Sequence, residues 1–113
     1  MKFEGGIIQI NSEEDGLDSN GNITISGGQL IVVGTSSADN QPIDQDGLLS
    51  ITGGTVLAGG RSSMRGVKTT TNQAIGFYVK HVEAEAKLII YNENNKKIIE
   101  VEAPKPVEYL YFS

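Results

Sequence analysis

The sequence predicts an all-β fold, a parallel β-helix of about three coils that is capped by a small antiparallel β-sheet. The first observation is an internal repeat, because residues 23–34 (ITISGGQLIVVG) return 26 positions later as residues 49–60 (LSITGGTVLAGG). The acidic turn before them, LDSNG at 17–21, returns in the same register as IDQDG at 43–47. A partial copy, GGIIQI at 5–10, also begins with a Gly-Gly pair, and the next such pair follows at 27–28. Periods of about 20–50 residues are typical of solenoids and other repeat folds.

The second observation is the pattern of the apolar runs in this half of the chain. The runs are short enough for strands, and apolar and polar residues alternate along them with a period of two. They occupy residues 7–10, 23–26, 29–33, 48–52 and 55–58. Gly-Gly pairs at 5–6, 27–28 and 53–54 precede or separate these runs, and glycine permits a corner in the backbone there. A small antiparallel sandwich with accidental repetition is the alternative.

The third observation is that the strand-like runs become longer from about residue 74. Four longer strands are expected at 74–82, 87–92, 97–102 and 107–112, with a hairpin turn at Asn94-Asn95. We expect them to form the antiparallel cap over one open end. Residues 61–73 (RSSMRGVKTTTNQ) are polar and unpatterned, and we expect a connecting loop. The chain therefore divides into coils at 1–60, a loop at 61–73 and a cap at 74–113.

Charge is distributed unevenly between these parts. Residues 1–60 carry eight acidic groups and one lysine, a net charge of −7, and residues 61–113 carry six glutamates and eight Lys or Arg, a net charge of +2. Without a basic stripe, nucleic-acid binding is not expected. The chain has no cysteine, which excludes disulfides and thiolate metal sites. No apolar run reaches the roughly 18 residues of a membrane span, so no membrane insertion is expected.

Stacked coils would place the two acidic turns one above the other. Residues one period apart lie about 4.8 Å from each other across a parallel rung, so Asp18 is expected over Asp44 and Asn20 over Asp46. Two carboxylates at that distance repel by about 1 kcal/mol in water and by roughly 3–4 kcal/mol at an effective dielectric constant near 20. A Ca²⁺ ion would offset this repulsion, because it binds carboxylate, amide and carbonyl oxygens. The expected ligands are Asp15, Asp18, Asn20, Asp44 and Asp46, and the alternative is that these residues only form turns.

The run EEDGLDSNGNITISGGQLIVVG, the stacked IDQDG and LSITGGTVLAGGRSSM resemble a bacterial carbohydrate-binding domain family with a right-handed parallel β-helix. The resemblance covers roughly residues 5–66. It implies a cell-surface or extracellular protein with a pectate-lyase-like fold, bound calcium and a plant polysaccharide as partner. The chain departs from the family at residues 40–46 (NQPIDQD) and in Ser62-Ser63-Met64-Arg65, which lacks a glycine before methionine.

Residues of the second half are the candidates for sugar contacts. Tyr109 and Tyr111 fall on one face of a strand, and exposed tyrosines stack on sugar rings, although core packing is the alternative. Arg61 and Arg65 are basic groups in the expected loop. A lyase needs such a base near calcium, but a base must be positioned on a rigid element. His81 with Glu83 is expected to be a surface pair.

These considerations predict a non-catalytic, calcium-stabilised polysaccharide-binding module. The alternatives are a structural stalk or adhesin segment in which calcium provides rigidity, and then a polysaccharide lyase. MKFEGG does not resemble a signal peptide, and the coils start almost at Met1 without a cap. We therefore expect an excised C-terminal end of a longer solenoid, whose open end joins upstream coils or associates end to end.

Overall fold

The computed structural model describes residues 1–35, 37–64 and 67–113, and these residues form an all-β structure without a helix. The strands form a seven-stranded mixed sheet and two separate two-stranded sheets. The strands are β1 (Lys2–Phe3), β2 (Ile7–Ile10), β3 (Leu17–Ser19), β4 (Ile23–Thr35), β5 (Ile43–Gln45), β6 (Leu49–Gly60), β7 (Thr69–Thr71), β8 (Gly76–Val82), β9 (Lys87–Tyr91), β10 (Lys97–Glu102) and β11 (Val107–Phe112).

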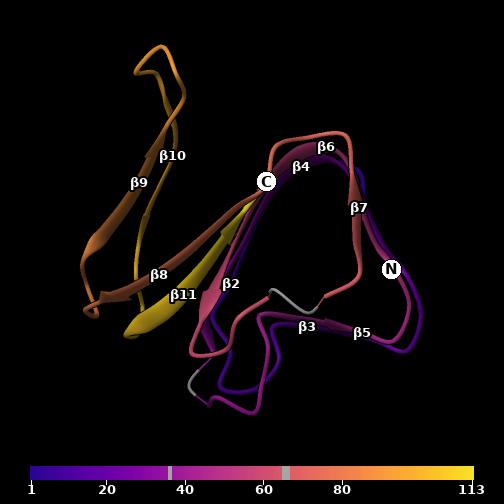
Figure 1. Cartoon of the computed structure of the whole chain (residues 1–113), viewed down its shortest axis with the longest axis horizontal. Coiled ribbons are helices and arrows are strands. Elements are labelled where there is room, and N and C mark those ends of the chain that lie inside the picture. The colour runs from indigo at the N-terminus through magenta and orange to yellow at the C-terminus, as the bar shows by residue number, and fades with distance from the viewer. Residues whose placement is uncertain (36, 65–66) are drawn as a thin grey trace.

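The repeat half is built from parallel strand pairs. β1 and β2 both pair with β4, and they share one offset, as in Lys2 with Thr24 and Ile7 with Gln29. β3 pairs with β5, and β4 with β6, at the offset of the sequence repeat, as in Ile23 with Leu49. The register read from the repeat is confirmed, and the antiparallel alternative is wrong for these strands. Successive passes of the chain lie over one another along a roughly three-sided outline (Figure 1).

The Gly-Gly corners bend strands rather than separate them. We expected two short runs on either side of each corner, but β4 and β6 each continue through it, with a register irregularity at the corner. Gly6, Gly28 and Gly54 occupy equivalent positions with φ of 83°, 82° and 81°. Left-handed backbone of this kind favours glycine, so the chain turns without losing its pairing to the next pass (Figure 1).

The main core lies inside these passes. Ile23, Ile25, Leu49 and Ile51 are at most 1% exposed and stack in pairs across the parallel rungs. Residues from the expected loop complete it, because Met64 is buried there. The same segment contains β7, which pairs in parallel with the first residues of β6. Residues 61–64 and 67–73 therefore add a partial pass over one end of the core.

The four C-terminal strands occur where the sequence predicts them, but they do not form one sheet. β11 pairs antiparallel with both β6 and β8, so these two strands extend the main sheet. β9 and β10 form a separate hairpin, with Asn95 at φ 60° in its turn. The hairpin packs Leu88, Ile90, Ile99 and Val101 against a second core that contains Ile31, Val33 and Leu57. It therefore covers the outer face of β4 and β6, and projects from the other strands in Figure 1.

Candidate functional site

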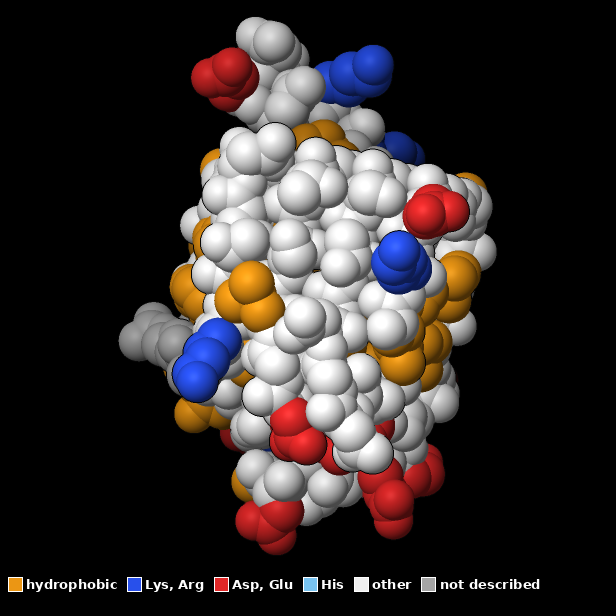
Figure 2. Space-filling model, turned by 90° about the vertical axis from the view of Figure 1, so that its right-hand side faces the viewer, with side chains coloured by type: hydrophobic (Ala, Val, Ile, Leu, Met, Phe, Trp, Pro, Cys, Tyr) orange, Lys and Arg blue, Asp and Glu red, His pale blue; other side chains and the backbone are white. Residues whose placement is uncertain are grey.

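The two acidic turns meet at β3 and β5. Asp18 and Asp44 are direct partners in the parallel pair, as expected from the repeat. The backbone N–H of Asp46 donates to the carbonyl of Ser19 (3.0 Å), and the N–H of Gly47 donates to the carbonyl of Gly21 (3.0 Å). Figure 2 shows acidic side chains gathered at the lower end of one face, the end at which β3 and β5 lie in Figure 1.

Asp44 is the electrostatic centre of this group. Burial, followed by the negative charges of Asp15, Asp18 and Asp46, raises its pKa above the ordinary 3.8, and a backbone hydrogen bond from Gln45 opposes that rise. None of the ion pairs among the described residues involves these four aspartates. The carboxylates are therefore close enough to repel one another, and no lysine or arginine in those ion pairs neutralises them.

Two polar side chains hold successive turns together from one repeat to the next. Asp15 Oδ1 accepts a hydrogen bond from the backbone N–H of Gln41 (2.7 Å). Asn22 Oδ1 accepts one from the backbone N–H of Leu48 (2.8 Å). Asp15 thus has a structural role besides its charge. Asn22 was not among the sequence candidates, although its position one full repeat before Leu48 was the available signal.

The oxygen set suits calcium only with mixed ligands. Among the described residues, no three acidic or histidine side chains are grouped so that they could hold a metal ion. A cation at the Asp18–Asp44 rung would therefore use few carboxylates and complete its shell with carbonyl, amide and water oxygens, as Ca²⁺ does. Asp46 and Asn20 are exposed on the same turns and would supply such ligands. The donors are all oxygen, which fits a hard cation.

A polar hollow of about 280 Å³ lies beside this rung. Its lining combines carboxylates, amides, one hydroxyl and one lysine. The residues are Gln41, Asp44, Gln45, Asp46, Gly47, Ser63, Val67 and Lys68. Gln45 Oε1 is buried here without a hydrogen-bond partner, while its amide nitrogen donates to the carbonyl of Lys68 (3.5 Å). One buried acceptor therefore stays unpaired beside the two aspartates of this lining.

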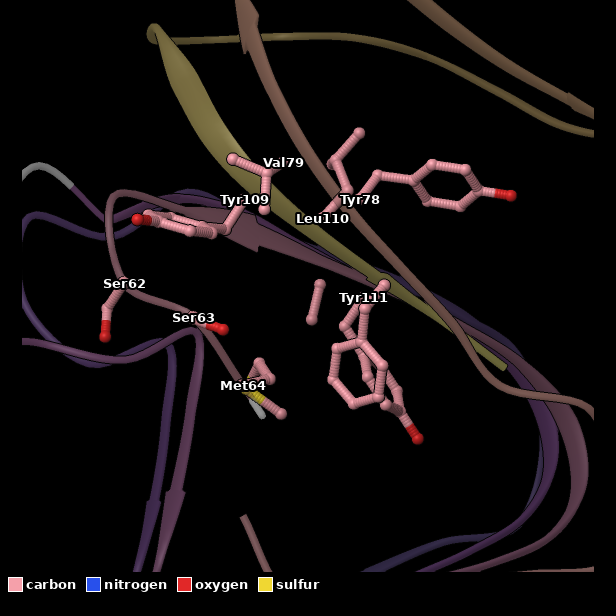
Figure 3. Close-up of a pocket in the computed structure, with 10 residues that line it drawn as sticks. Ser62, Ser63, Met64, Tyr78, Val79, Tyr109, Leu110 and Tyr111 are labelled. Carbon is pink, nitrogen blue, oxygen red and sulfur yellow. The ribbon is translucent and has the colours of Figure 1, made fainter. Parts of the chain in front are cut away.

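The expected tyrosine pair is divided between the core and the surface. Tyr111 is 1% exposed and packs edge-on against Phe77, with ring centroids 5.3 Å apart. Burial raises its pKa. In Figure 3, Tyr109 lies near Ser62, whereas Tyr111 lies farther along the same strand. Core packing, the alternative to a sugar platform, holds for Tyr111, because its ring fills the end of the main core. Tyr109 is only partly buried.

Of the two candidate arginines, Arg61 does not join the acidic turns. Arg61 is exposed, pairs with Glu108 (3.6 Å) and lines a different hollow, with His81 and Lys105. His81 lies 3.0 Å from Glu83 on the surface, as expected. Arg65 lies outside the described residues.

Two exposed tyrosines were not among the candidates. Tyr78 is 62% and Tyr91 56% exposed, and both line an apolar groove of about 410 Å³ between the main sheet and β9. Strand alternation alone does not reveal them, because it leaves open which face of β8 is covered.

Comparisons with models of protein families, with curated proteins and with solved structures found no match. In the part of the chain that the structure describes, no helix is long and apolar enough to span a membrane.

Proposed function

We propose that the chain is a non-catalytic, extracellular polysaccharide-binding module, built as a right-handed parallel β-helix of about three coils with an antiparallel cap and stabilised by Ca²⁺. The observation that carries the proposal is the Asp18–Asp44 rung, with the raised pKa of Asp44 between neighbouring carboxylates. Like charges placed directly opposite each other destabilise a sheet. A bound divalent cation turns that cost into a stabilising interaction.

The polar hollow beside the rung is the proposed sugar site. An acidic polysaccharide such as a polyuronate presents carboxylates and hydroxyls, and a calcium ion held by Asp44 and Asp46 would bridge the sugar carboxylate to this anionic protein. Lys68 at the lining would complement the sugar's charge.

Calcium binding is tested by calorimetry and thermal denaturation, with chelated protein as the reference. We expect heat of binding and a higher melting temperature with Ca²⁺, and the loss of both in Asp44→Asn. Asp39→Asn is the matched control, since it also removes one negative charge but Asp39 is not among the carboxylates that act on Asp44. No heat and no thermal shift at millimolar calcium would leave the acidic turns with a purely local role.

Sugar binding is tested by electrophoresis through a gel containing polygalacturonate, with Ca²⁺ or with chelator. We expect retardation only with Ca²⁺, and its loss in Lys68→Glu while calorimetric calcium binding is kept. Equal migration in all conditions would contradict the sugar site.

A structural stalk or adhesin segment is the second candidate, and the burial of Tyr111 favours it, because one aromatic sugar platform is removed. Calcium stabilisation without retention by any glycan on an array would support it. A lyase ranks below both, since Arg61 is paired with Glu108 and does not line the hollow beside the acidic turns. Absence of unsaturated product after incubation with polygalacturonate is the expected result.

A further inference from the structure

Only one asparagine of the sequence is followed by glycine, and the structure places it at an exposed bend. Asn20 and Gly21 come directly after β3, which ends at Ser19. Both residues are exposed, and a Cβ added at Gly21 would meet no heavy atom within 4 Å. No other part of the described chain therefore crowds the side of Gly21 on which a side chain would stand.

An asparagine in this setting reacts with its own backbone. The nitrogen of the following residue loses its proton and attacks the side-chain Cγ. A new N–C bond forms, the bond from Cγ to the amide nitrogen breaks, and ammonia leaves with the proton. The cyclic imide then takes up one water and opens at either carbonyl, which gives aspartate or isoaspartate. Glycine favours this reaction, because it leaves the nitrogen unshielded and the backbone free to turn.

We infer that Asn20 is a site of spontaneous modification, at which the folded protein converts the side-chain amide into a carboxylate. The attacking nitrogen is that of Gly21, whose N–H donates to Ser19 Oγ (3.2 Å) at the surface. Water readily replaces an exposed bond of this kind, so the nitrogen is available. By contrast, the side-chain oxygens of Asn22 and Asn92 accept hydrogen bonds from backbone N–H groups, which hold these amides in place.

The next pass contains the same turn in a protected form. Asp46 and Gly47 stand one repeat after Asn20 and Gly21. The N–H of Gly47 donates to the carbonyl of Gly21 (3.0 Å), and a Cβ added at Gly47 would come within 2.1 Å of Asn22 Oδ1. The preceding pass therefore holds the nitrogen of Gly47, whereas that of Gly21 has only its local bond. Asp46 also shows that this position of the turn accepts a carboxylate.

Conversion changes the charge of the acidic turns. Asn20 stands one repeat before Asp46, so its product forms a second acid pair beside the Asp18–Asp44 rung. Like charges opposite each other on neighbouring strands are destabilising. Isoaspartate carries the same added charge and also lengthens the backbone by one methylene group. The converted protein should therefore melt at a lower temperature than the fresh protein in chelator.

Incubation of the full chain at mildly alkaline pH, followed by mass spectrometry of its peptides, tests the site. We expect the peptide with Asn20 to gain the mass difference between oxygen and NH, faster at higher pH, and to take up heavy oxygen from labelled water. Gly21→Ala should largely lose this conversion, because the methyl group shields the nitrogen. The φ of Gly21 is not left-handed and the space beside it is open, so this variant should keep its melting temperature. Asn20→Asp should melt at a lower temperature in chelator without any incubation.

Gly5→Ala is the matched control, because a Cβ there also meets nothing within 4 Å. This variant should convert Asn20 as fast as the unmodified chain. An Asn20 that stays intact in the folded protein would overturn the inference, whether or not unfolding in urea releases the reaction. Equal conversion in Gly21→Ala, or earlier conversion of another asparagine, would overturn it as well. Converted protein that melts together with the fresh protein in chelator would overturn the stated effect on the acidic turns.

Discussion

At the scale of single residues, Asp44 is the carboxylate that is repelled by its neighbours when the acidic turn is repeated in the next pass. Its direct partner across the rung is Asp18, while Asp15 and Asp46 add further negative charge. Two positions further along the two turns, an amide is combined with a carboxylate, Asn20 with Asp46, instead of a second acid pair. Asn22 uses its side-chain oxygen to bind the backbone of the next turn. The repulsion is therefore centred on one rung, which is where a cation would have the largest effect.

The pKa of Asp44 predicts how stability depends on pH without calcium. Because the folded protein raises this pKa above the ordinary 3.8, the ionised form destabilises the native state. In chelator, this contribution should make the protein more stable as pH falls from neutral through the raised pKa toward 3.8. Asp44→Asn should be more stable than the unmodified chain at neutral pH by about 1 kcal/mol, the size of one exposed pair repulsion.

Thermal denaturation in chelator between neutral pH and about pH 4, close to the ordinary pKa of aspartate, checks this prediction, with Asp39→Asn as the charge-matched control. The difference between Asp44→Asn and the unmodified protein should shrink as pH falls. A difference that stays constant with pH would mean that the ionised carboxylate of Asp44 costs the fold nothing.

At the scale of elements, the corners of β4 and β6 show what keeps the passes in register. The backbone of Gly54 has φ of 81° and lies against the backbone of the preceding pass, where an added Cβ would come within 2.7 Å of the carbonyl oxygen of Gly28. The corner therefore needs glycine both for its conformation and for the closeness of the next pass. The same two conditions hold at Gly28 against Gly5 and Gly6.

Gly54→Ala should consequently destabilise the chain by more than the roughly 1–2 kcal/mol that left-handed backbone costs a non-glycine residue, because backbone atoms must also move. Gly5→Ala is the control, since a Cβ there meets nothing within 4 Å. Urea denaturation followed by circular dichroism measures both. Equal unfolding midpoints for the two variants would show that the corner can relax around a side chain.

Local sequence patterns predicted the positions of the strands better than they predicted which strands pair with one another. The repeat predicted the rungs, because identical spacing leaves one register that keeps Ile23 over Leu49 and Asp18 over Asp44. The C-terminal strands were also foreseen. Their assignment to two different sheets was not, because alternation of apolar residues does not state which strand pairs with which. β7 was missed for a similar reason, since three threonines form a strand only because the edge of β6 is available to them.

The two tyrosines of β11 illustrate the same limit, because strand parity gives them one face but different surroundings. Tyr111 is opposite Ala58 and Phe77, and its ring fills the core. Tyr111→Ala should cost about 3–5 kcal/mol of stability, as for other buried aromatics. Tyr109→Ala should cost less, since this residue is partly exposed. Chemical denaturation compares them, and a stability loss as large in Tyr109→Ala would place both rings in the core energetically.

At the scale of the whole molecule, the described residues form two bodies, the stacked passes and the β9–β10 hairpin. They differ in how many strand pairs hold them in place. The passes of β4 and β6 are hydrogen-bonded on both sides and enclose the main core. The β9–β10 hairpin makes no strand pair with the main sheet and is held by side chains packed on Ile31, Val33 and Leu57. A two-stranded hairpin alone is marginal in water, so its order depends on that packing.

Hydrogen exchange should therefore separate the two bodies. Amides of β4 and β6 should exchange only on global unfolding, whereas those of β9 and β10 should exchange through a local opening of lower free energy. Ile99, 3% exposed in the second core, anchors the hairpin, so Ile99→Ala should accelerate exchange in β9 and β10 and leave β3 and β5 unchanged. Mass spectrometry of peptic peptides resolves these segments. Ile98→Ala is the matched control, because Ile98 is 38% exposed on the same strand. Equal protection of the hairpin and of β4 in the unmodified chain, or uniform acceleration in Ile99→Ala, would show instead that the two bodies unfold as one cooperative unit.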